Sequence, residues 1–233
     1  MFALYKKELN YYLNNPIGYI IVILFATFAN FMFVKDIFLV GSASLRPFFT
    51  ILPWLLMIFI PALTMRIFSE EKRVNTIEIL LTLPISERQI VVSKFLALTT
   101  ISFIGLFLTM GLAFSLSFLT TLYLPEIIIG YIGAILLSAL FISISMLFSS
   151  LTKNQVIAFL GSAITLFLLI LLSSDFFATS IPKFIQDTLI YFSPGYHLQN
   201  FAKGVVDLRS LIYFLSLTIS FLFLTIIDLK KRE

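Results

Sequence analysis

The chain has 233 residues, of which 60% are hydrophobic and 12% are charged, and its formal net charge is +4. Soluble globular proteins carry about 45–50% apolar and about 25% charged residues, so this composition excludes a soluble globular domain and predicts an integral membrane protein. The chain contains no cysteine, which excludes disulfides, a thiol nucleophile and a cysteine-ligated metal site.

The first 15 residues, MFALYKKELNYYLNN, are predicted to form a helix that lies in the membrane interface. Apolar residues recur at helical spacing on one face, while the lysines and asparagines lie mostly elsewhere. That apolar face comprises Phe2, Tyr5, Leu9, Tyr12 and Leu13. Pro16 then ends the helix and lets the chain turn into the membrane. The alternative is a frayed polar terminus, because chain ends are often disordered.

Six apolar runs follow along the chain. Crossing a hydrocarbon core about 30 Å thick takes roughly 20 mostly apolar residues, and only a helix satisfies its own backbone polar groups in lipid. The runs are residues 17–34, 48–65, 90–119, 127–151, 155–174 and 211–227. The first run is longer than the apolar region of a signal peptide and lacks a clear cleavage site, so we expect it to be retained. The sequence therefore predicts an all-α polytopic membrane protein with six transmembrane helices, in one domain over residues 1–233.

An even number of spans places both termini on the same side of the membrane. If that side is cytoplasmic, eleven Lys and Arg residues face inward and five face outward, which fits the positive-inside rule. The inward residues are Lys6, Lys7, Arg66, Lys72, Arg73, Arg88, Lys94, Lys153, Lys230, Lys231 and Arg232, and the outward residues are Lys35, Arg46, Lys183, Lys203 and Arg209. Residues 66–89 then form the first cytoplasmic loop.

The large external segment, residues 175–210, is predicted to contain two short helices. In PKFIQDTLIYF, Pro182 stands at a first helical turn and apolar residues follow at helical spacing, which indicates a helix in the outer interface. After a break at SPG, YHLQNFAKG predicts a second helix that Gly204 stops. His197 is the only histidine, so we expect a surface or interface residue there and no metal site.

Residues 66–89, RIFSEEKRVNTIEILLTLPISERQ, hold eight of the 28 charged residues in the chain (16 Lys and Arg, 12 Asp and Glu). Ser69 is predicted to cap a helix whose first turn holds Glu70 and Glu71, where the helix dipole favours negative charge. Apolar and polar residues recur on separate faces of this helix, and Pro84 closes it. The segment therefore predicts a short amphipathic helix.

The same loop ends in Ser86-Glu-Arg-Gln89, which has the pattern of a capping box that begins the third span. A two-faced helix held between two helix breaks suits a docking surface better than a passive connector. The loop also carries four basic and four acidic residues, whereas attraction to lipid alone would favour Lys and Arg. The alternative is a solvated flank, which charge beside a membrane often is.

The loop resembles the E-E-(K/R)-x-x-x-T-x-E-x-L-L-x-x-P signature of ABC-2 type transporter permeases. The matching residues are Glu70, Glu71, Lys72, Thr76, Glu78, Leu80, Leu81 and Pro84. Three further segments are similar to the permease branch named for gliding motility, and together the similarities cover nearly the whole chain. These segments are KKELNYYLNNPIGYI, SSLTKNQVIA and SPGYHLQNFAKGVVDLRSLIYF. Permeases of nitrous-oxide-reductase maturation and of efflux systems share much of the pattern.

The resemblance implies an exporter subunit in a bacterial cytoplasmic (inner) membrane, with both termini cytoplasmic and a link to gliding motility. It implies an interfacial helix at residues 1–15, a coupling helix in residues 66–89, and short outer helices in residues 175–210. Its implied partners are a second permease, identical or homologous, and P-loop nucleotide-binding ATPase subunits that hold the ATP and Mg; no cofactor belongs to this chain. The residues expected to couple to the ATPase are Glu70, Glu71, Lys72, Thr76, Glu78, Leu81, Pro84 and Lys153.

The sequence lacks the residues that ATP binding, proton-coupled transport and nucleic-acid binding would require. No G-x-x-x-x-G-K-[ST] motif is present, so a partner must bind any ATP, and we expect no catalytic residue here. The spans are almost free of ionisable residues, which argues against a proton-coupled carrier. The basic residues flank the spans, which fits membrane lipids as partners and gives no nucleic-acid footprint. The remaining alternative is a non-transporting membrane anchor that scaffolds an ATPase-containing complex.

Overall fold

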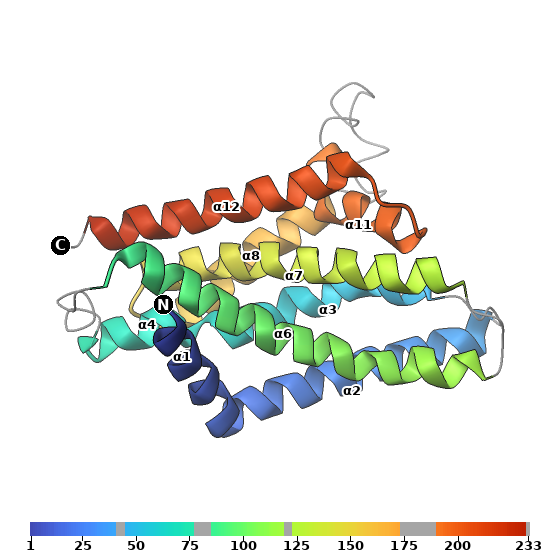
Figure 1. The fold of residues 1–233 in the computed structure, drawn as a ribbon, viewed down its shortest axis with the longest axis horizontal. Helices are drawn as coiled ribbons and strands as arrows, with labels where there is room; N and C mark the ends of the chain where they lie inside the picture. Colours follow the sequence, from blue (N-terminus) through green and yellow to red (C-terminus); the bar gives the residue numbers. More distant parts are fainter. Residues whose placement is uncertain (41–44, 77–84, 119–122, 173–189, 232–233) are drawn as a thin grey trace.

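A computed structural model describes residues 1–40, 45–76, 85–118, 123–172 and 190–231, and these residues form a bundle of helices (Figure 1). The helices are α1 (Phe2–Asn14), α2 (Pro16–Val40), α3 (Arg46–Thr64), α4 (Arg66–Arg73), α6 (Glu87–Ser117), α7 (Leu124–Leu151), α8 (Gln155–Leu171), α11 (Pro194–Ala202) and α12 (Leu208–Lys230). The predicted all-α class is confirmed.

Five of the described helical segments are long and apolar enough to cross a membrane. They are Pro16–Lys35, Arg46–Arg73, Glu87–Ser115, Leu124–Leu151 and Leu208–Lys230. Helix α8 is apolar over 17 residues and borders residues 173–189, which lie outside the described ranges. These helices match the six predicted runs, and the chain is a multi-pass membrane protein.

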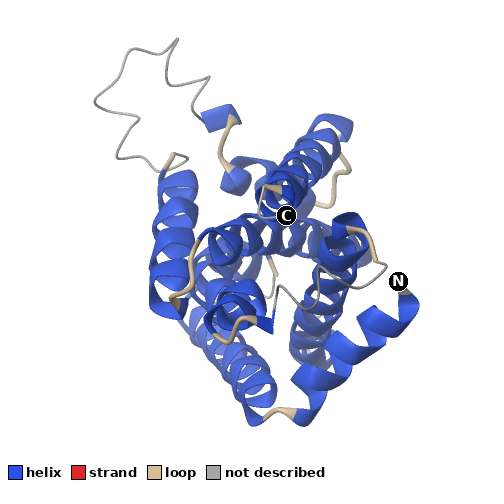
Figure 2. Cartoon of the chain, turned by 90° about the vertical axis from the view of Figure 1, so that its left-hand side faces the viewer, coloured by secondary structure: helices blue, strands red, loops and turns tan. Residues whose placement is uncertain are grey.

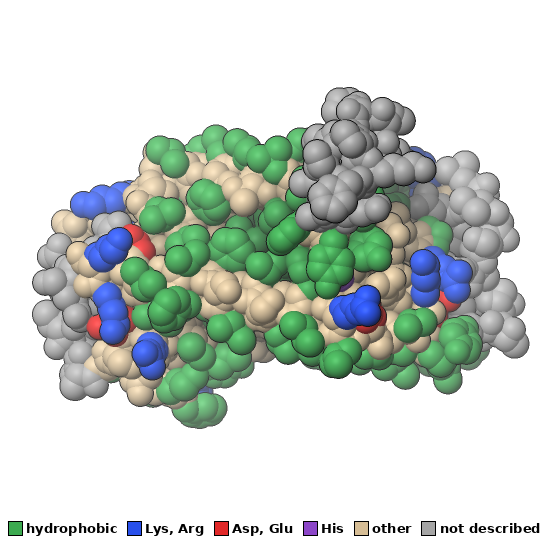
Figure 3. Space-filling model, turned by 90° about the horizontal axis from the view of Figure 1, so that it is seen from above, with side chains coloured by type: hydrophobic (Ala, Val, Ile, Leu, Met, Phe, Trp, Pro, Cys, Tyr) green, Lys and Arg blue, Asp and Glu red, His purple; other side chains and the backbone are tan. Residues whose placement is uncertain are grey.

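The side chains on the surface separate into an apolar middle and two charged ends. Figure 3 shows hydrophobic side chains over the length of the visible face, with Lys, Arg, Asp and Glu gathered toward both ends. Large apolar residues stay exposed on the flanks of the bundle, including Ile23, Phe107, Ile164 and Ile219. Because lipid tails solvate such side chains as well as a protein core does, this distribution fits a bundle surrounded by lipid.

Helix α7 is the centre of the bundle. It contacts α3, α4, α6, α8, α11 and α12. Of its most apolar stretch, 61% is buried inside the protein, compared with 28% for the corresponding stretches of α2 and α12. Figure 2 looks along the bundle from the end that carries both termini, and Figure 1 shows α4 at that same end. At the opposite end Arg46 of α3 pairs with Glu126 of α7, with 3.3 Å between Nε and Oε2.

The corner between α1 and α2 forms where the sequence predicts it. Helix α1 ends at Asn14, α2 begins at Pro16, and the side chain of Asn15 accepts a hydrogen bond from the Ile17 amide at 3.2 Å. Gly18 is required there, since a Cβ atom would lie 2.3 Å from the Tyr12 carbonyl oxygen. A side chain at position 18 would therefore push α1 away from α2.

The apolar face predicted for α1 is only partly the face that packs against the bundle. The buried residues of α1 are Leu4, Glu8 and Tyr12, whereas Phe2 is 77% exposed. The packed face follows i, i+4 spacing and includes a charged residue, because Glu8 has a partner inside the protein. The apolar face predicted for the membrane interface is thus a different set of residues from the packed face, and the two share only Tyr12.

Other helix starts follow ordinary capping chemistry. The hydroxyl of Ser86 accepts a hydrogen bond from the Gln89 amide at 3.4 Å, which confirms the predicted cap of the third span. Asn154, Ser193 and Asp207 cap α8, α11 and α12 in the same way.

The described part of the outer segment contains α11, as predicted, but the SPG sequence is its start and not a break before it. Gly204 follows the helix with φ of +78°, a conformation that favours glycine. His197 is fully buried, and its ring centroid lies 4.0 Å from that of Tyr213. Of the predicted alternatives, a surface or an interface residue, the surface one was therefore wrong. Most of the helix predicted to begin at Pro182 lies outside the described residues, and its described end is helical at Ile190 and Tyr191.

Candidate functional site

Helix α4 carries the first third of the charged loop, and it continues almost directly from the second membrane span. Only Met65 separates α3 from α4, and its backbone keeps helical angles, with φ of −53° and ψ of −29°. Ser69 therefore lies inside a helix, fully buried, and its hydroxyl donates to the Met65 carbonyl. The prediction that Ser69 caps a new helix was wrong, because the preceding span supplies the start of the helix.

A serine of α7 holds the junction between α3 and α4. The hydroxyl oxygen of Ser149 accepts hydrogen bonds from the amides of Phe68 at 3.1 Å and Ser69 at 3.2 Å. The same hydroxyl donates to the Met65 carbonyl at 3.0 Å. One buried side chain thus satisfies three backbone groups at the junction and joins α4 to the central helix.

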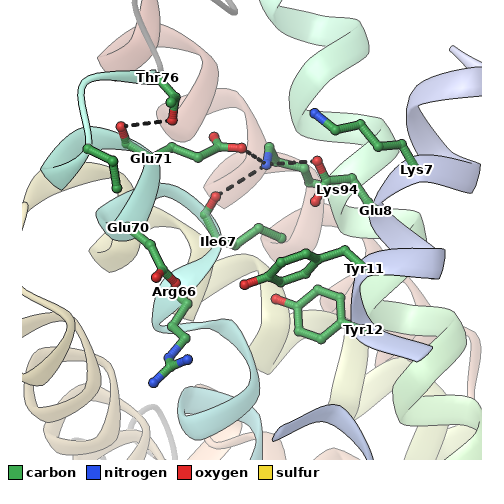
Figure 4. A pocket seen from close by; sticks show the side chains of 11 residues that line it. Lys7, Glu8, Tyr11, Tyr12, Arg66, Ile67, Glu70, Glu71, Thr76 and Lys94 are labelled. Atoms are coloured by element: carbon green, nitrogen blue, oxygen red, sulfur yellow. Dashed lines mark hydrogen bonds and ion pairs between the residues drawn. The ribbon is translucent and has the colours of Figure 1, made fainter. Parts of the chain in front are cut away.

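A buried lysine joins α4 to two further helices. Nζ of Lys94, on α6, lies 2.7 Å from Oε1 of Glu71 on α4 and 3.1 Å from Oε1 of Glu8 on α1. It also donates to the Ile67 carbonyl at 3.2 Å, and all three contacts are visible in Figure 4. The Lys94 side chain is 1% exposed, so its charge depends on these oxygens for stabilisation.

A second ion pair joins α4 to the last span. Nζ of Lys72 lies 3.4 Å from Oδ2 of Asp228 on α12, and their side chains are 2% and 16% exposed. Because Asp228 is close to the C-terminal end of α12, this contact lies at the end of the bundle that carries both termini. Helix α4 is therefore fastened by polar contacts to α6, α7 and α12, and Lys94 of α6 links it in turn to α1.

The predicted coupling residues divide into three groups. Glu71 and Lys72 point into the protein, while Glu70 lies near the surface within 3.7 Å of the Arg73 guanidinium. Thr76 is exposed, and its hydroxyl donates to the Glu71 carbonyl at 3.3 Å. Lys153 is exposed in the separate connection between α7 and α8. Glu78, Leu81 and Pro84 lie outside the described residues.

A pocket of about 310 Å³ opens between α1 and α4, beside Lys94 (Figure 4). Its walls include Lys7, Tyr11, Arg66 and Glu70, together with the Glu8–Lys94–Glu71 cluster. Arg66 and Glu71 each also have one fully buried polar atom, Nε and Oε2 respectively, with no hydrogen-bond partner among the described residues.

Tyr12 closes the inner side of this pocket. Its hydroxyl donates to the Leu63 carbonyl at 3.1 Å, which ties α1 to the end of α3. Burial raises the pKa of Tyr12 well above its usual range, and the nearby Glu8 carboxylate adds to that effect. The phenol therefore stays protonated and keeps donating this hydrogen bond at any physiological pH.

Sequence reasoning missed Glu8, Lys94 and Asp228 as parts of the site. Lys94 and Asp228 stand near the polar ends of apolar helices and Glu8 stands in the short polar-apolar helix α1, where charged residues are normally interpreted as solvated. The sequence feature that could have indicated this role is the position of Lys94. It lies seven residues after Glu87, the first residue of a segment that is long enough to span the membrane. An ionisable residue inside such a segment needs a partner, although the sequence does not say which one.

Comparison with known proteins gives one family. The family model described as ABC-2 family transporter protein matches residues 5–228, and this range includes every contact described above. No curated protein matches the chain.

Proposed function

The chain belongs to the ABC-2 transporter family and is the membrane-spanning permease subunit of an ABC transporter; from this premise we propose that α4 passes ATP-driven motion from a separate ATPase into the bundle. The observation that carries the proposal is the attachment of α4 by polar contacts to α6, α7 and α12, and through Lys94 of α6 to α1. A helix fastened to so many others cannot shift alone, so a force applied to it reaches much of the bundle.

Within this proposal the loop divides its work between two sets of residues. Glu71 and Lys72 connect α4 to the permease itself, through Lys94 and Asp228. The contact with the ATPase then belongs to the partly exposed Glu70, to the exposed Thr76 and Lys153, and to Glu78, Leu81 and Pro84 further along the loop. This division supports a loop that passes motion from the ATPase to the permease, with one set of residues facing each of the two proteins.

The proposed assembly contains two permeases and two P-loop ATPase subunits, and the ATP and Mg are bound by the ATPases. Its expected location is a bacterial inner membrane, with α4 and both termini on the cytoplasmic side, as the eleven-to-five Lys and Arg distribution favours. We also propose that the complex exports its substrate. The loop similarities to the gliding-motility branch support a role in gliding, which a deletion strain would test by its movement on a surface.

Charge and apolar substitutions in the outer half of the loop test the coupling. Glu78→Lys should weaken binding by several times the roughly 0.2–1 kcal/mol of an exposed ion pair, because repulsion replaces attraction at a partly desolvated contact. Leu81→Asp should remove an apolar anchor. The control is Lys203→Glu, which reverses a charge immediately after α11, at the other end of the chain's bundle.

The measurements are co-purification with the cognate ATPase and substrate-stimulated ATP hydrolysis in proteoliposomes. We expect both loop variants to lose binding or stimulation while Lys203→Glu keeps them. Unchanged binding and stimulation in both variants would identify the loop as a solvated flank. An ATPase that binds the wild-type chain but gains no substrate-dependent activity would instead support the scaffold alternative.

A further inference from the structure

Helix α2 lies at the edge of the bundle, and one of its sides has no neighbour among the described helices (Figure 1). The helix contacts α1, α3 and α6, and only 28% of its most apolar stretch is buried. Exposed and half-exposed positions recur on it at spacings of three, four, three and four residues. These positions, which we call the α2 stripe, are Ile20, Ile23, Thr27, Asn30 and Val34. Two helices that cross at a small left-handed angle interlock their side chains at this spacing.

The α2 stripe contains two polar side chains that have no hydrogen-bond partner. An exposed apolar stripe alone does not indicate a protein partner, because lipid tails cover such side chains equally well. The Thr27 hydroxyl and the Asn30 amide, however, make no hydrogen bond with another described residue. Both residues lie within the span Pro16–Lys35, where hydrocarbon offers neither a donor nor an acceptor. These two side chains therefore favour a partner that lipid cannot supply.

The other exposed hydroxyls of the described spans are satisfied by their own helices. Each donates to a backbone carbonyl three or four residues earlier, as in Thr50, Ser115, Ser216 and Ser220. Such a hydroxyl needs no group from outside its helix. Thr27 and Asn30 thus distinguish the exposed side of α2 from those of α6 and α12.

The Asn30 amide is suited to a hydrogen bond with a second copy of itself. Its Oδ1 atom is buried without a partner, whereas its Nδ2 atom is also unpaired but is not buried. A half-turn about the Cβ–Cγ bond exchanges these two atoms without changing the shape of the side chain. Across a two-fold axis, one amide can therefore present its nitrogen while the other presents its oxygen. The Thr27 hydroxyl is likewise both a donor and an acceptor.

We propose that two copies of this chain pack against each other through the α2 stripe, with their Asn30 amides hydrogen-bonded near the two-fold axis. The inference rests on the proposed assembly of two permeases and names the surface that joins them. Ile20, Ile23 and Val34 supply apolar contacts on either side of the polar pair. The amides also fix the register of the two helices, because a shifted register would leave both of them unpaired in hydrocarbon.

Disulfide cross-linking tests the surface, since the chain has no cysteine. The single variants Ile23→Cys, Thr27→Cys and Val34→Cys are prepared in the full chain, reconstituted in liposomes and oxidised, and dimers are quantified on a non-reducing gel. We expect each variant to cross-link several times more than two controls. Phe28→Cys is exposed on α2 outside the stripe, and Ile219→Cys is exposed on α12.

Substitutions of the polar pair test what holds the two copies together. Asn30→Leu should raise the dissociation constant of the dimer by about five- to thirtyfold, which corresponds to about 1–2 kcal/mol for one hydrogen bond between membrane helices. Asn30→Gln keeps an amide and should bind more tightly than Asn30→Leu. The matched control is Ser220→Ala, which removes an exposed hydroxyl that already has a partner in its own helix. Energy transfer between labelled copies, as the chain is diluted with lipid, measures the dissociation constant.

Equal cross-linking from the α2 stripe and from Phe28→Cys would overturn the proposal, as would a dimer whose dissociation constant Asn30→Leu leaves unchanged. Dimers linked through Ile219→Cys in place of the stripe would reject α2 as the surface but leave the assembly of two permeases intact. A wild-type chain that stays monomeric in the liposomes would reject the pairing of identical copies. A chain that pairs through α2 without stimulating the ATPase would support this inference and reject only the coupling through α4.

Discussion

Oε1 of Glu71 and Nζ of Lys94 lie 2.7 Å apart, and this contact joins the helix of the charged loop to the first turns of the third span. The two residues are 23 positions apart in the sequence, with the end of the loop between them. The pair is partly buried and shares its lysine with Glu8, so α1, α4 and α6 meet at one ammonium group.

Lys94→Met should destabilise the folded protein by about 3–5 kcal/mol, because it leaves two carboxylates without their buried cation. Thermal unfolding in detergent would measure the loss. Arg88→Met, at an exposed position of the same helix, should change stability by less than about 0.5 kcal/mol. Similar effects of the two substitutions would show that the cluster is not a centre of stability.

Lys72 and Asp228 should be energetically coupled. In a double-mutant cycle with Lys72→Gln and Asp228→Asn, the double variant should be more stable than the sum of the single effects predicts, by about 0.5–3 kcal/mol. Unfolding of the four proteins in one detergent gives the coupling energy. Strict additivity would mean that the 3.4 Å contact contributes no specific link between α4 and α12.

The two ends of the bundle should lie on opposite sides of the membrane. Since the chain has no cysteine, single variants Asn75→Cys, Lys153→Cys and Lys231→Cys can be compared with Tyr123→Cys and Gln199→Cys, and all five positions are exposed. In intact cells an impermeant thiol reagent should label only the last two. Labelling at position 75 from outside would reverse the proposed orientation, and permeabilised cells supply the control for reactivity.

His197 should make stability depend on pH. Burial lowers its pKa from the usual 6.5, and this effect outweighs the Tyr191 carbonyl and the Asp207 charge, which favour the protonated ring. The folded protein therefore resists protonation more than the unfolded chain does. Stability should be constant above 6.5 and fall as the pH drops from 6.5 toward the lowered pKa.

Thermal unfolding between about pH 7.5 and about pH 5 would measure this dependence, since His197 is the only histidine. The variant His197→Gln should have a flatter profile over that range, even if it is less stable throughout. An equally steep profile in the variant would assign the pH dependence to another group.

Gly133 should be intolerant of a side chain. A Cβ atom there would lie 2.6 Å from Cβ of Phe201, so α11 would have to move away from α7. Gly133→Ala should therefore cost about 1–3 kcal/mol. Gly111→Ala is the control, because a Cβ at that position meets nothing within 4 Å and an alanine should favour the helix. Equal stability of the two variants would contradict the close packing of α7 and α11.

The spans and most helix starts could be predicted because their signals are local. Apolar length predicts a membrane helix, and the cap at Ser86 depends on residues within one turn. The Ser69 prediction failed for the same reason: its local pattern is that of a cap, but the helix before it continues through Met65. A local pattern cannot report whether the preceding helix has ended.

The site was harder to predict from the sequence, because its contacts join distant parts of the chain. Lys94 meets Glu8 across 86 positions, and Lys72 meets Asp228 across 156. The sequence did identify the loop that contains Glu71 and Lys72. It could not show that these two side chains turn inward, since that depends on which helices pack around α4.

The helical backbone at Met65 joins the second span and α4 into one nearly continuous rod. The 28 residues from Arg46 to Arg73 form a rod of about 42 Å, longer than a hydrocarbon core of about 30 Å. The hydrogen bonds of Ser149 hold the junction in place, and Pro53 and Pro61 are the points where the rod can bend. A tilt of about 10° about its midpoint would move each end by about 4 Å in opposite directions. If α4 moves as proposed and the rod does not bend at its prolines, the ion pair between Arg46 and Glu126 at the far end would be displaced with it.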